Sequence, residues 1–309
     1  MTGNRLPAGD RLRVLVVGAG YLAGRVGGRL GALGHTVTLS SRRRPATAQA
    51  RRLGWHPVDV GDRRSVHALF AATAPDAVVV AHGPSDITWC EANPGQAMAA
   101  HRGGARYLAE ALGSRRALLI STDNVFPGSR SSYGESDRAE PANAYGRAKL
   151  AAEDTLLATG DVLVLRVSLV YGWDRDGLRP NFFTTCAQQL SRSRPVAVPD
   201  DHWNSPVLID DVAEWTTALL GSAHTGVVHL GGPRRVSRLA WARHIAACCG
   251  RDPALVRTLP KHSTVYACRP RNACLHSERA AHLPELAGLD PVDVLEASTR
   301  LIIQEEESR

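Results

Sequence analysis

The chain has 309 residues, a formal net charge of +7 and six cysteines that form no CxxC pair. This length allows a large core, and the balance of apolar and charged residues is typical of a globular protein. No run of about 18 apolar residues is present, which excludes a membrane-spanning helix, and the N-terminus lacks the apolar core of a signal peptide. We therefore expect a cytoplasmic protein with reduced thiols and no metal site.

The positive charge comes from arginine, with clusters at 42–44, 51–52 and 63–64. Neither an aromatic reading surface nor a helix-turn-helix pattern accompanies these clusters, so we do not expect nucleic-acid binding. Only two lysines stand among the 37 lysines and arginines, which indicates a compositional bias toward arginine. The charge therefore favours small anionic ligands together with a solvated surface.

Apolar runs and helical patterns alternate along the first half of the chain. The strand-like runs lie within 11–20, 35–41, 76–83, 116–123 and 161–172. Between them, helical spacing of apolar residues recurs at 21–34, 64–74 and 97–113. This alternation predicts an α/β fold with a doubly wound parallel sheet, that is, a Rossmann domain.

The pattern loosens after residue 172, and the later elements suggest that the chain returns to the sheet. An amphipathic helix is expected at 207–220, a strand at 226–232 and a further helix at 237–250. We assign 10–172 plus about 205–232 to the Rossmann domain, and about 173–204 plus 233–309 to a smaller mixed C-terminal substrate lobe. Residues 304–309 are expected to be a solvated, frayed end.

A glycine turn joins the first strand to the first helix. Gly18, Gly20 and Ala23 fit the pattern GxGxx(G/A), which lets backbone N–H groups approach a pyrophosphate at a helix N-terminus. We therefore predict a dinucleotide site that includes Gly18, Gly20, Tyr21 and Leu22.

The end of the second strand indicates which dinucleotide is bound. An NAD site has an acidic residue there, whereas this chain has Ser41, Arg42 and Arg43. Arginine and serine suit the extra phosphate of NADP, so NADPH is expected and NADH is less favoured. Asp59 and Val60 follow another short strand; they edge the adenine or simply end that strand.

Tyr145 and Lys149 stand four residues apart in a strongly helix-forming stretch, which places them on one helix face. A nearby ammonium favours the phenolate and is expected to lower the pKa of the tyrosine. Such a tyrosine can exchange a proton with a substrate oxygen while a nicotinamide moves a hydride. Arginine differs in reach and geometry, which accounts for a lysine at this position.

Several motifs occur in family order between about residues 13 and 280: the glycine turn, STDNVFPG, PANAYGRAKLAAE, RVSLVYG, DDHWNSPVLIDDVA and RPRN. With these motifs the chain resembles the extended short-chain dehydrogenase/reductases, and within them the dTDP-4-dehydrorhamnose reductase-like group of sugar-nucleotide reductases. The resemblance implies an NADPH-dependent reductase of a keto group on a nucleotide-activated deoxysugar or related metabolite. A homodimer is possible in such a family.

The resemblance also implies roles for individual residues. Thr122 would hydrogen-bond the substrate oxygen, Tyr145 would be the general acid, and Lys149 would tune Tyr145 and hold the nicotinamide ribose. The cofactor site gains Ala81, His82 and Gly83. The implied substrate contacts are Asp123, Asn124, Val125, Asn181 and Arg269.

Some residues depart from the family pattern. His101 replaces an asparagine that supports the lysine in relatives, and either takes over that role or packs. His82 replaces a small residue near the nicotinamide path, and Leu169 replaces a tryptophan that faces the substrate. These departures bear on the substrate more than on the fold.

Two other functions stay open. An epimerase or dehydratase of the same superfamily holds NAD tightly, which the basic end of the second strand disfavours; a dehydratase also carries an Asp-Glu pair where this chain has Asp123 and Asn124. A non-catalytic, NADP-binding regulatory subunit is compatible with an intact Tyr145 and Lys149.

Overall fold

The computed structural model describes residues 11–47, 51–174, 176–260 and 263–308. These residues form a seven-stranded parallel sheet with the strand order β11-β6-β5-β4-β1-β2-β3. The strands are β1 (Arg13–Val17), β2 (Thr36–Ser41), β3 (Gly54–Pro57), β4 (Ala77–Val80), β5 (Arg116–Thr122), β6 (Val162–Val167) and β11 (Gly226–Leu230). This is the doubly wound order, so the predicted Rossmann-type α/β fold is confirmed.

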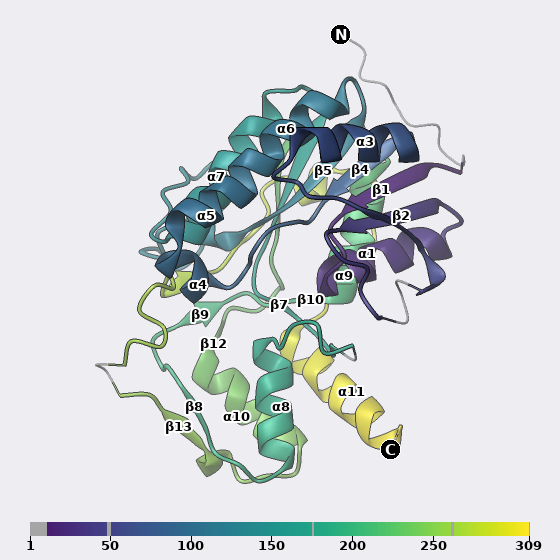
Figure 1. The fold of residues 1–309 in the computed structure, drawn as a ribbon. Coiled ribbons are helices and arrows are strands. Elements are labelled where there is room, and N and C mark those ends of the chain that lie inside the picture. Colours follow the sequence, from purple (N-terminus) through teal and green to yellow (C-terminus); the bar gives the residue numbers. More distant parts are fainter. Residues whose placement is uncertain (1–10, 48–50, 175, 261–262, 309) are drawn as a thin grey trace.

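Helices cover both faces of the sheet (Figure 1). On one face lie α1 (Tyr21–Ala32) and α9 (Ile209–Leu220); on the other lie α3 (Arg63–Thr73), α6 (Gly104–Leu112) and α7 (Ala144–Leu157). Strand β1 shows why its sequence is continuously apolar. Val14 and Val16 pack toward α1 and α9, whereas Leu15 and Val17 pack toward α3 and α6. A strand buried on both sides needs apolar residues at every position.

The short helices α4 (Ile87–Ala92) and α5 (Pro94–Met98) lie beside α7, and most of the other elements form the middle and lower part of the molecule in Figure 1. They are α8 (Phe182–Ser191), α10 (Arg238–Cys248), α11 (Val294–Glu307), the pair β8 (Val196–Val198) and β13 (Val256–Thr258), the small sheet of β12 (Val236–Ser237), β9 (Trp203–Asn204) and β14 (Asn272–Ala273), and the pair β7 (Val170–Tyr171) and β10 (Val207–Leu208). Trp241 is fully buried at the centre of this lobe, and its indole donates to Ser298 Oγ over 3.0 Å. The proposed boundaries between the two lobes stay a prediction.

The C-terminal helix corrects one expectation. Residues 304–307 belong to α11 and are not frayed. Asp293 caps the helix by accepting from Leu295 N over 2.9 Å, and Ile302 is 3% exposed. Trp173 also donates to the carbonyl of Leu301. These contacts anchor α11 as far as Ile302, while Gln304, Glu306 and Glu307 are exposed, so the end is solvated as expected but helical. Among the described residues, no helix is long and apolar enough to cross a membrane.

A buried ion pair joins α7 to the centre of the sheet. Arg166 on β6 contacts Glu153 on α7 over 2.7 Å, and their side chains are 7% and 1% exposed. Ser121 on β5 donates to the same carboxylate. Glu153 therefore fixes α7 against β5 and β6 at once.

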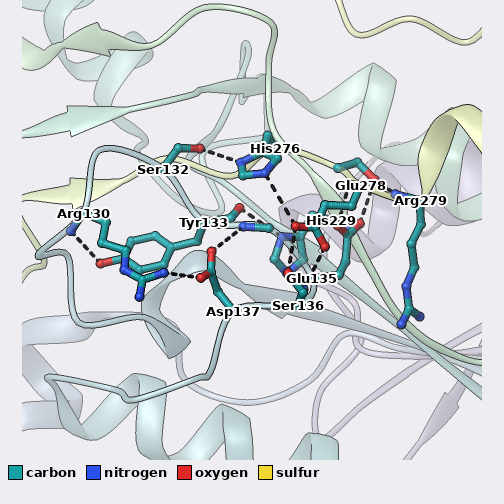
Figure 2. Close-up of polar contacts among 12 residues, drawn as sticks. Arg130, Ser132, Tyr133, Glu135, Ser136, Asp137, His229, His276, Glu278 and Arg279 are labelled. Atoms are coloured by element: carbon teal, nitrogen blue, oxygen red, sulfur yellow. Dashed lines mark hydrogen bonds and ion pairs between the residues drawn. The ribbon is translucent and has the colours of Figure 1, made fainter.

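A second polar network continues from this pair toward the surface. His229 on β11 lies 3.5 Å from Arg166, and its backbone N–H donates to Glu135 over 2.8 Å. Glu135 also accepts from Ser277 Oγ and from the backbone N–H of Glu278, each over 2.7 Å. Figure 2 shows Glu135, His229 and Glu278 close together. These contacts connect the loop before α7 to β11 and to the segment that carries Glu278.

Replacing Glu153 with glutamine leaves Arg166 as a buried, uncompensated charge, so we expect Glu153→Gln to lose about 3–5 kcal/mol of unfolding free energy. Urea unfolding followed by circular dichroism measures this loss. The double variant Glu153→Leu with Arg166→Met should lose less, because no charge stays buried. As a control, Glu110→Gln breaks the exposed pair with Arg63 and should cost less than about 1 kcal/mol. A wild-type urea midpoint for Glu153→Gln would contradict this account.

Candidate active site

The carboxyl ends of β1, β4 and β5 meet at the point where the strand order reverses, which is where ligands bind in folds of this kind. Gly18 follows β1 with φ 137°, and a Cβ added there would lie 2.7 Å from the carbonyl oxygen of Ala81, just after β4. A side chain is therefore excluded at Gly18 by conformation and by space. The glycine turn is packed directly against the end of β4.

The first turn of α1 presents backbone donors to open space. Gly20 is its N-cap, no side chain caps the helix, and a Cβ added at Gly20 would meet no atom within 4 Å. The N–H groups from Tyr21 and Leu22 onward therefore suit a pyrophosphate. The Tyr21 hydroxyl is buried, and a Cβ at Gly172 would lie 3.0 Å from it, so the hydroxyl packs against the chain just after β7.

At the end of β2, Ser41 is already held by protein groups. Its hydroxyl donates to the carbonyl of Arg43 over 2.6 Å and accepts from the Trp55 indole over 3.0 Å. Arg42 and Arg43 are exposed. The strand end thus offers two accessible guanidinium groups. Trp55 was not predicted from the sequence, because no local sequence pattern indicates that an indole on β3 hydrogen-bonds a serine on β2.

The hydrogen bonds of Asp59 belong to the turn that follows β3. Its carboxylate accepts from Gly61 N over 2.9 Å, and its own N–H donates to Ser65 Oγ over 2.9 Å. Val60 packs against α6, where a Cβ added at Gly104 would lie 3.3 Å from it. A contact of this pair with adenine stays a prediction.

His82 has a buried ring nitrogen without a partner. Its Nε2 lies 3.2 Å from the carbonyl of Ala100, which can only accept, so this nitrogen carries the proton. Nδ1 is then a buried acceptor that no described residue satisfies. Burial lowers the pKa of His82 to about 4, and the Lys149 ammonium adds to this effect. His82 is therefore neutral near pH 7.

His101 packs against the predicted catalytic tyrosine. It lies in a π-helical turn, Ala99–Gly103, which interrupts the single helix expected at 97–113. Nε2 donates to the carbonyl of Pro84 over 2.9 Å, and the ring meets that of Tyr145 edge-on with centroids 5.7 Å apart. A Cβ at Gly83 would lie 2.4 Å from this imidazole. Burial lowers the pKa of His101 to about 3.

Tyr145 and Lys149 are both on α7, and burial dominates their protonation. Lys149 is 4% exposed, its Nζ donates to the carbonyl of Ile120 over 2.7 Å, and burial lowers its pKa to about 8. Burial raises the pKa of Tyr145 to about 12. The expected lowering of the tyrosine pKa is therefore wrong for this structure. The ammonium is directed at the strand carbonyl, and the loss of hydration of the phenolate outweighs the opposing effects of Arg179 and Thr122.

The Thr122 hydroxyl forms three hydrogen bonds at the end of β5. It donates to Asp123 Oδ1 over 3.2 Å and accepts from Asn124 N and Nδ2 over 3.1 and 3.2 Å. Its interaction with Tyr145 lowers the pKa of that tyrosine somewhat, against the larger effect of burial. Thr122 therefore lies beside the tyrosine, but its proton is directed at Asp123.

Asp123 is 4% exposed, and burial raises its pKa to about 6. Hydrogen bonds from Ser168 over 3.1 Å and from Asn124 over 2.8 Å oppose this rise. Asn124 in turn accepts from Asn143 over 2.9 Å. A buried carboxyl that titrates near neutrality thus adjoins Thr122.

The other predicted substrate contacts have different surroundings. Val125 is fully buried in an apolar cluster with Phe126, which gives its side chain no surface for a ligand. Asn181 caps α8, accepting from Thr184 N and donating to the carbonyl of Gly172. The structure therefore explains both residues through packing and capping. Arg269 donates to Thr88 Oγ1 over 3.1 Å, across to the segment after β4.

Comparison with known proteins identifies the family. A model described as the RmlD substrate binding domain matches residues 13–288. The chain belongs to the RmlD substrate-binding-domain family. This confirms the resemblance to the dTDP-4-dehydrorhamnose reductase-like group that its motifs predicted.

Individual proteins are similar to this chain over most of its length. A dTDP-4-keto-6-deoxy-D-glucose reductase of Streptomyces niveus is 34% identical over 253 residues, covering 80% of this chain and 82% of that protein. Methionine adenosyltransferase 2 subunit beta of Mus musculus is 29% identical over 276 residues, covering 85% and 80%. The fold also matches a dTDP-4-dehydrorhamnose reductase of Bacillus anthracis, solved with NADP, with a TM-score of 0.81, 20% identity and coverage of 96% and 100%.

Asp123 should make stability depend on pH. The pKa of Asp123 is about 6 in the folded chain, above the 3.8 of a free aspartate. The protonated carboxyl therefore stabilises the folded state fully below about pH 4, and this stabilisation is lost as the pH rises through 6. Above pH 6 the buried carboxylate costs about 2–3 kcal/mol. Asp123→Asn should therefore unfold at higher temperature than the wild type at pH 8, with little difference at pH 4. Calorimetry at both pH values tests this, and an equal shift at both would count against it.

Proposed function

We propose that this protein is an NADPH-dependent reductase of a keto group on a nucleotide-activated deoxysugar or related metabolite. The observation that carries this proposal is the meeting of Thr122, Tyr145 and Lys149 at the sheet edge that also holds the glycine turn. The similarity to the dTDP-4-keto-6-deoxy-D-glucose reductase of Streptomyces niveus supports the same chemistry.

The chain's residues fit the cofactor. The open N-terminus of α1, from Gly20, would bind the pyrophosphate, while Arg42 and Arg43 would bind the 2′-phosphate. The segment Ala81–Gly83 would line the path to the nicotinamide, where the orphan Nδ1 of His82 offers an acceptor. When bound, NADPH supplies the hydride that reduces the carbonyl carbon.

Tyr145 would donate the proton that the carbonyl oxygen gains. Its pKa of about 12 keeps it protonated at neutral pH, as a general acid requires. Lys149 would favour the phenolate as it forms and hold the nicotinamide ribose. Thr122 would redirect its proton from Asp123 to the substrate oxygen, which a protonated Asp123 would assist because a neutral carboxyl is a weaker acceptor than a carboxylate.

A second candidate is a non-catalytic, NADP-binding regulatory subunit. The similarity to methionine adenosyltransferase 2 subunit beta favours it, and so does the engagement of the Thr122 proton by Asp123. An epimerase or dehydratase is less well supported, because no acid ends β2 and Asn124 follows Asp123. We further propose that the protein forms a homodimer, that it is located in the cytoplasm and that its ligand is a small-molecule substrate.

Substitutions in the proposed catalytic set should separate chemistry from cofactor binding. Tyr145→Phe removes the proton donor but keeps the ring, so reduction should fall about 10²–10⁴-fold while NADPH still binds. Lys149→Arg should also abolish turnover, and Thr122→Val should cost less. Single-turnover oxidation of NADPH with dTDP-4-keto-6-deoxy sugars measures these effects. Near-normal chemistry in Tyr145→Phe would favour the regulatory function instead.

The cofactor preference can be tested at the end of β2. Each charge-assisted bond to phosphate contributes about 1.5–3 kcal/mol, so Arg42→Ala with Arg43→Ala should weaken NADPH by at least about tenfold and leave NADH nearly unchanged. Fluorescence titration of both cofactors measures this. Arg64→Ala, on α3, serves as the matched control. Equal losses for the two cofactors would refute the assignment of the 2′-phosphate site.

A further inference from the structure

Arg238 is the first residue of α10, at the side of the lobe that faces the sheet edge. Its backbone N–H donates to the carbonyl of His202 over 2.9 Å, beside the paired strands β9 and β12. Its guanidinium carbon lies 4.5 Å from the centroid of the Phe182 ring and 5.9 Å from that of Tyr266. Two aromatic rings therefore hold the cation in place.

The charge of Arg238 lacks a direct partner. Its Nε is buried and has no hydrogen-bond partner within the described part of the chain. Among the described residues, Asp123 is near enough to act on it electrostatically but forms no ion pair with it. Burying a cation without a paired anion is costly. Arg238 thus has the properties of a group that receives an anion from a ligand.

Two more basic side chains, those of Arg269 and His202, lie around Tyr266. The guanidinium carbon of Arg269 lies 5.3 Å from the centroid of Tyr266, and the His202 ring meets it edge-on at 5.2 Å. His202 Nδ1 contacts Asp201 over 2.8 Å, while its Nε2 is buried and unpartnered among the described residues. Two guanidinium groups therefore lie at Tyr266, and the Nε of one of them, Arg238, has no hydrogen-bond partner among the described residues.

The charge of Arg238 acts on a residue of the candidate active site. Arg238 and Asp123 are within electrostatic reach of each other, and Asp123 accepts a hydrogen bond from Thr122. A substrate whose keto oxygen approached Thr122 would extend the rest of its length toward the lobe. A guanidinium presents paired donors that match phosphate oxygens, which favours phosphate as the anion.

We infer that Arg238 binds the diphosphate of the substrate directly, with Arg269 as a second cation. This rests on the proposed function, because a nucleotide-activated sugar carries its diphosphate on the side away from the reacting carbon. Arg269 already donates to Thr88 and to the carbonyl of Val265, whereas Arg238 keeps unused donors. Arg238 is therefore the stronger contact of the two.

Calorimetric binding of dTDP, UDP and GDP, with thymidine as a neutral reference, tests the inference. For the nucleoside diphosphate that binds best, Arg238→Gln should weaken affinity about 10–100-fold, the loss expected for charge-assisted bonds to phosphate. Arg238→Lys should fall in between, and NADPH affinity should not change. The matched control is Arg243→Gln, an exposed position on the same helix, which should bind as the wild type does.

The inference is overturned if no nucleoside diphosphate binds the wild type, or if Arg238→Gln binds it as tightly as Arg243→Gln does. Glucuronate is titrated in the same way. The inference is also overturned if Arg238→Gln weakens the binding of glucuronate but of no nucleoside diphosphate, because the anion that Arg238 binds would then be a sugar carboxylate. These titrations do not depend on turnover, so the two proposals can fail separately. If Arg238→Gln weakens diphosphate binding but the wild type reduces no keto sugar, the reductase function is refuted and the diphosphate site at Arg238 is supported. In an active enzyme, Arg238→Gln should raise KM with little change in kcat.

Discussion

The carboxylate of Glu153, buried between α7 and the sheet, is the constraint on which the candidate active site depends. Tyr145, Lys149 and Glu153 follow one another at intervals of four residues and therefore share one face of α7. Glu153 is held by Arg166 on β6 and by Ser121 on β5. Since Ser121 immediately precedes Thr122, the ion pair also fixes the helix relative to the strand end. An ion pair buried this deeply mainly positions α7 against the sheet, because the desolvation of the two charges offsets much of their attraction.

Burial shifts the protonation of this region in one direction. The pKa of Asp123 rises to about 6 and that of Tyr145 to about 12, while the pKa of Lys149 falls to about 8. His82 and His101 are likewise neutral. In every case the loss of hydration is the largest cause, so each group is displaced toward its uncharged form. Groups in this condition respond strongly to a charged ligand, because any new charge nearby acts through a medium that screens it poorly.

Lysine and arginine have separate uses in this chain. Lys149 occupies a narrow position under β5, where a compact ammonium reaches a backbone carbonyl. Arg166 forms several bonds to one carboxylate, and Arg238 lies against aromatic rings, both of which suit a planar guanidinium. The rarity of lysine in the composition therefore made the one at 149 informative, whereas the abundance of arginine concealed Arg238.

The sequence by itself determined the elements and their order. Apolar runs of strand length, alternating with helical spacing, fix a parallel sheet because strands buried on both faces need such runs. The glycine turn and the Tyr145–Lys149 spacing are local too, so they could be read directly. Only the tertiary structure decided which side chains from separate segments meet: Trp55 with Ser41, Ser168 with Asp123, and Arg238 with Tyr266. It also decided the direction of the tyrosine pKa, because burial depends on what the rest of the chain places around a residue, and spacing along the sequence does not record that.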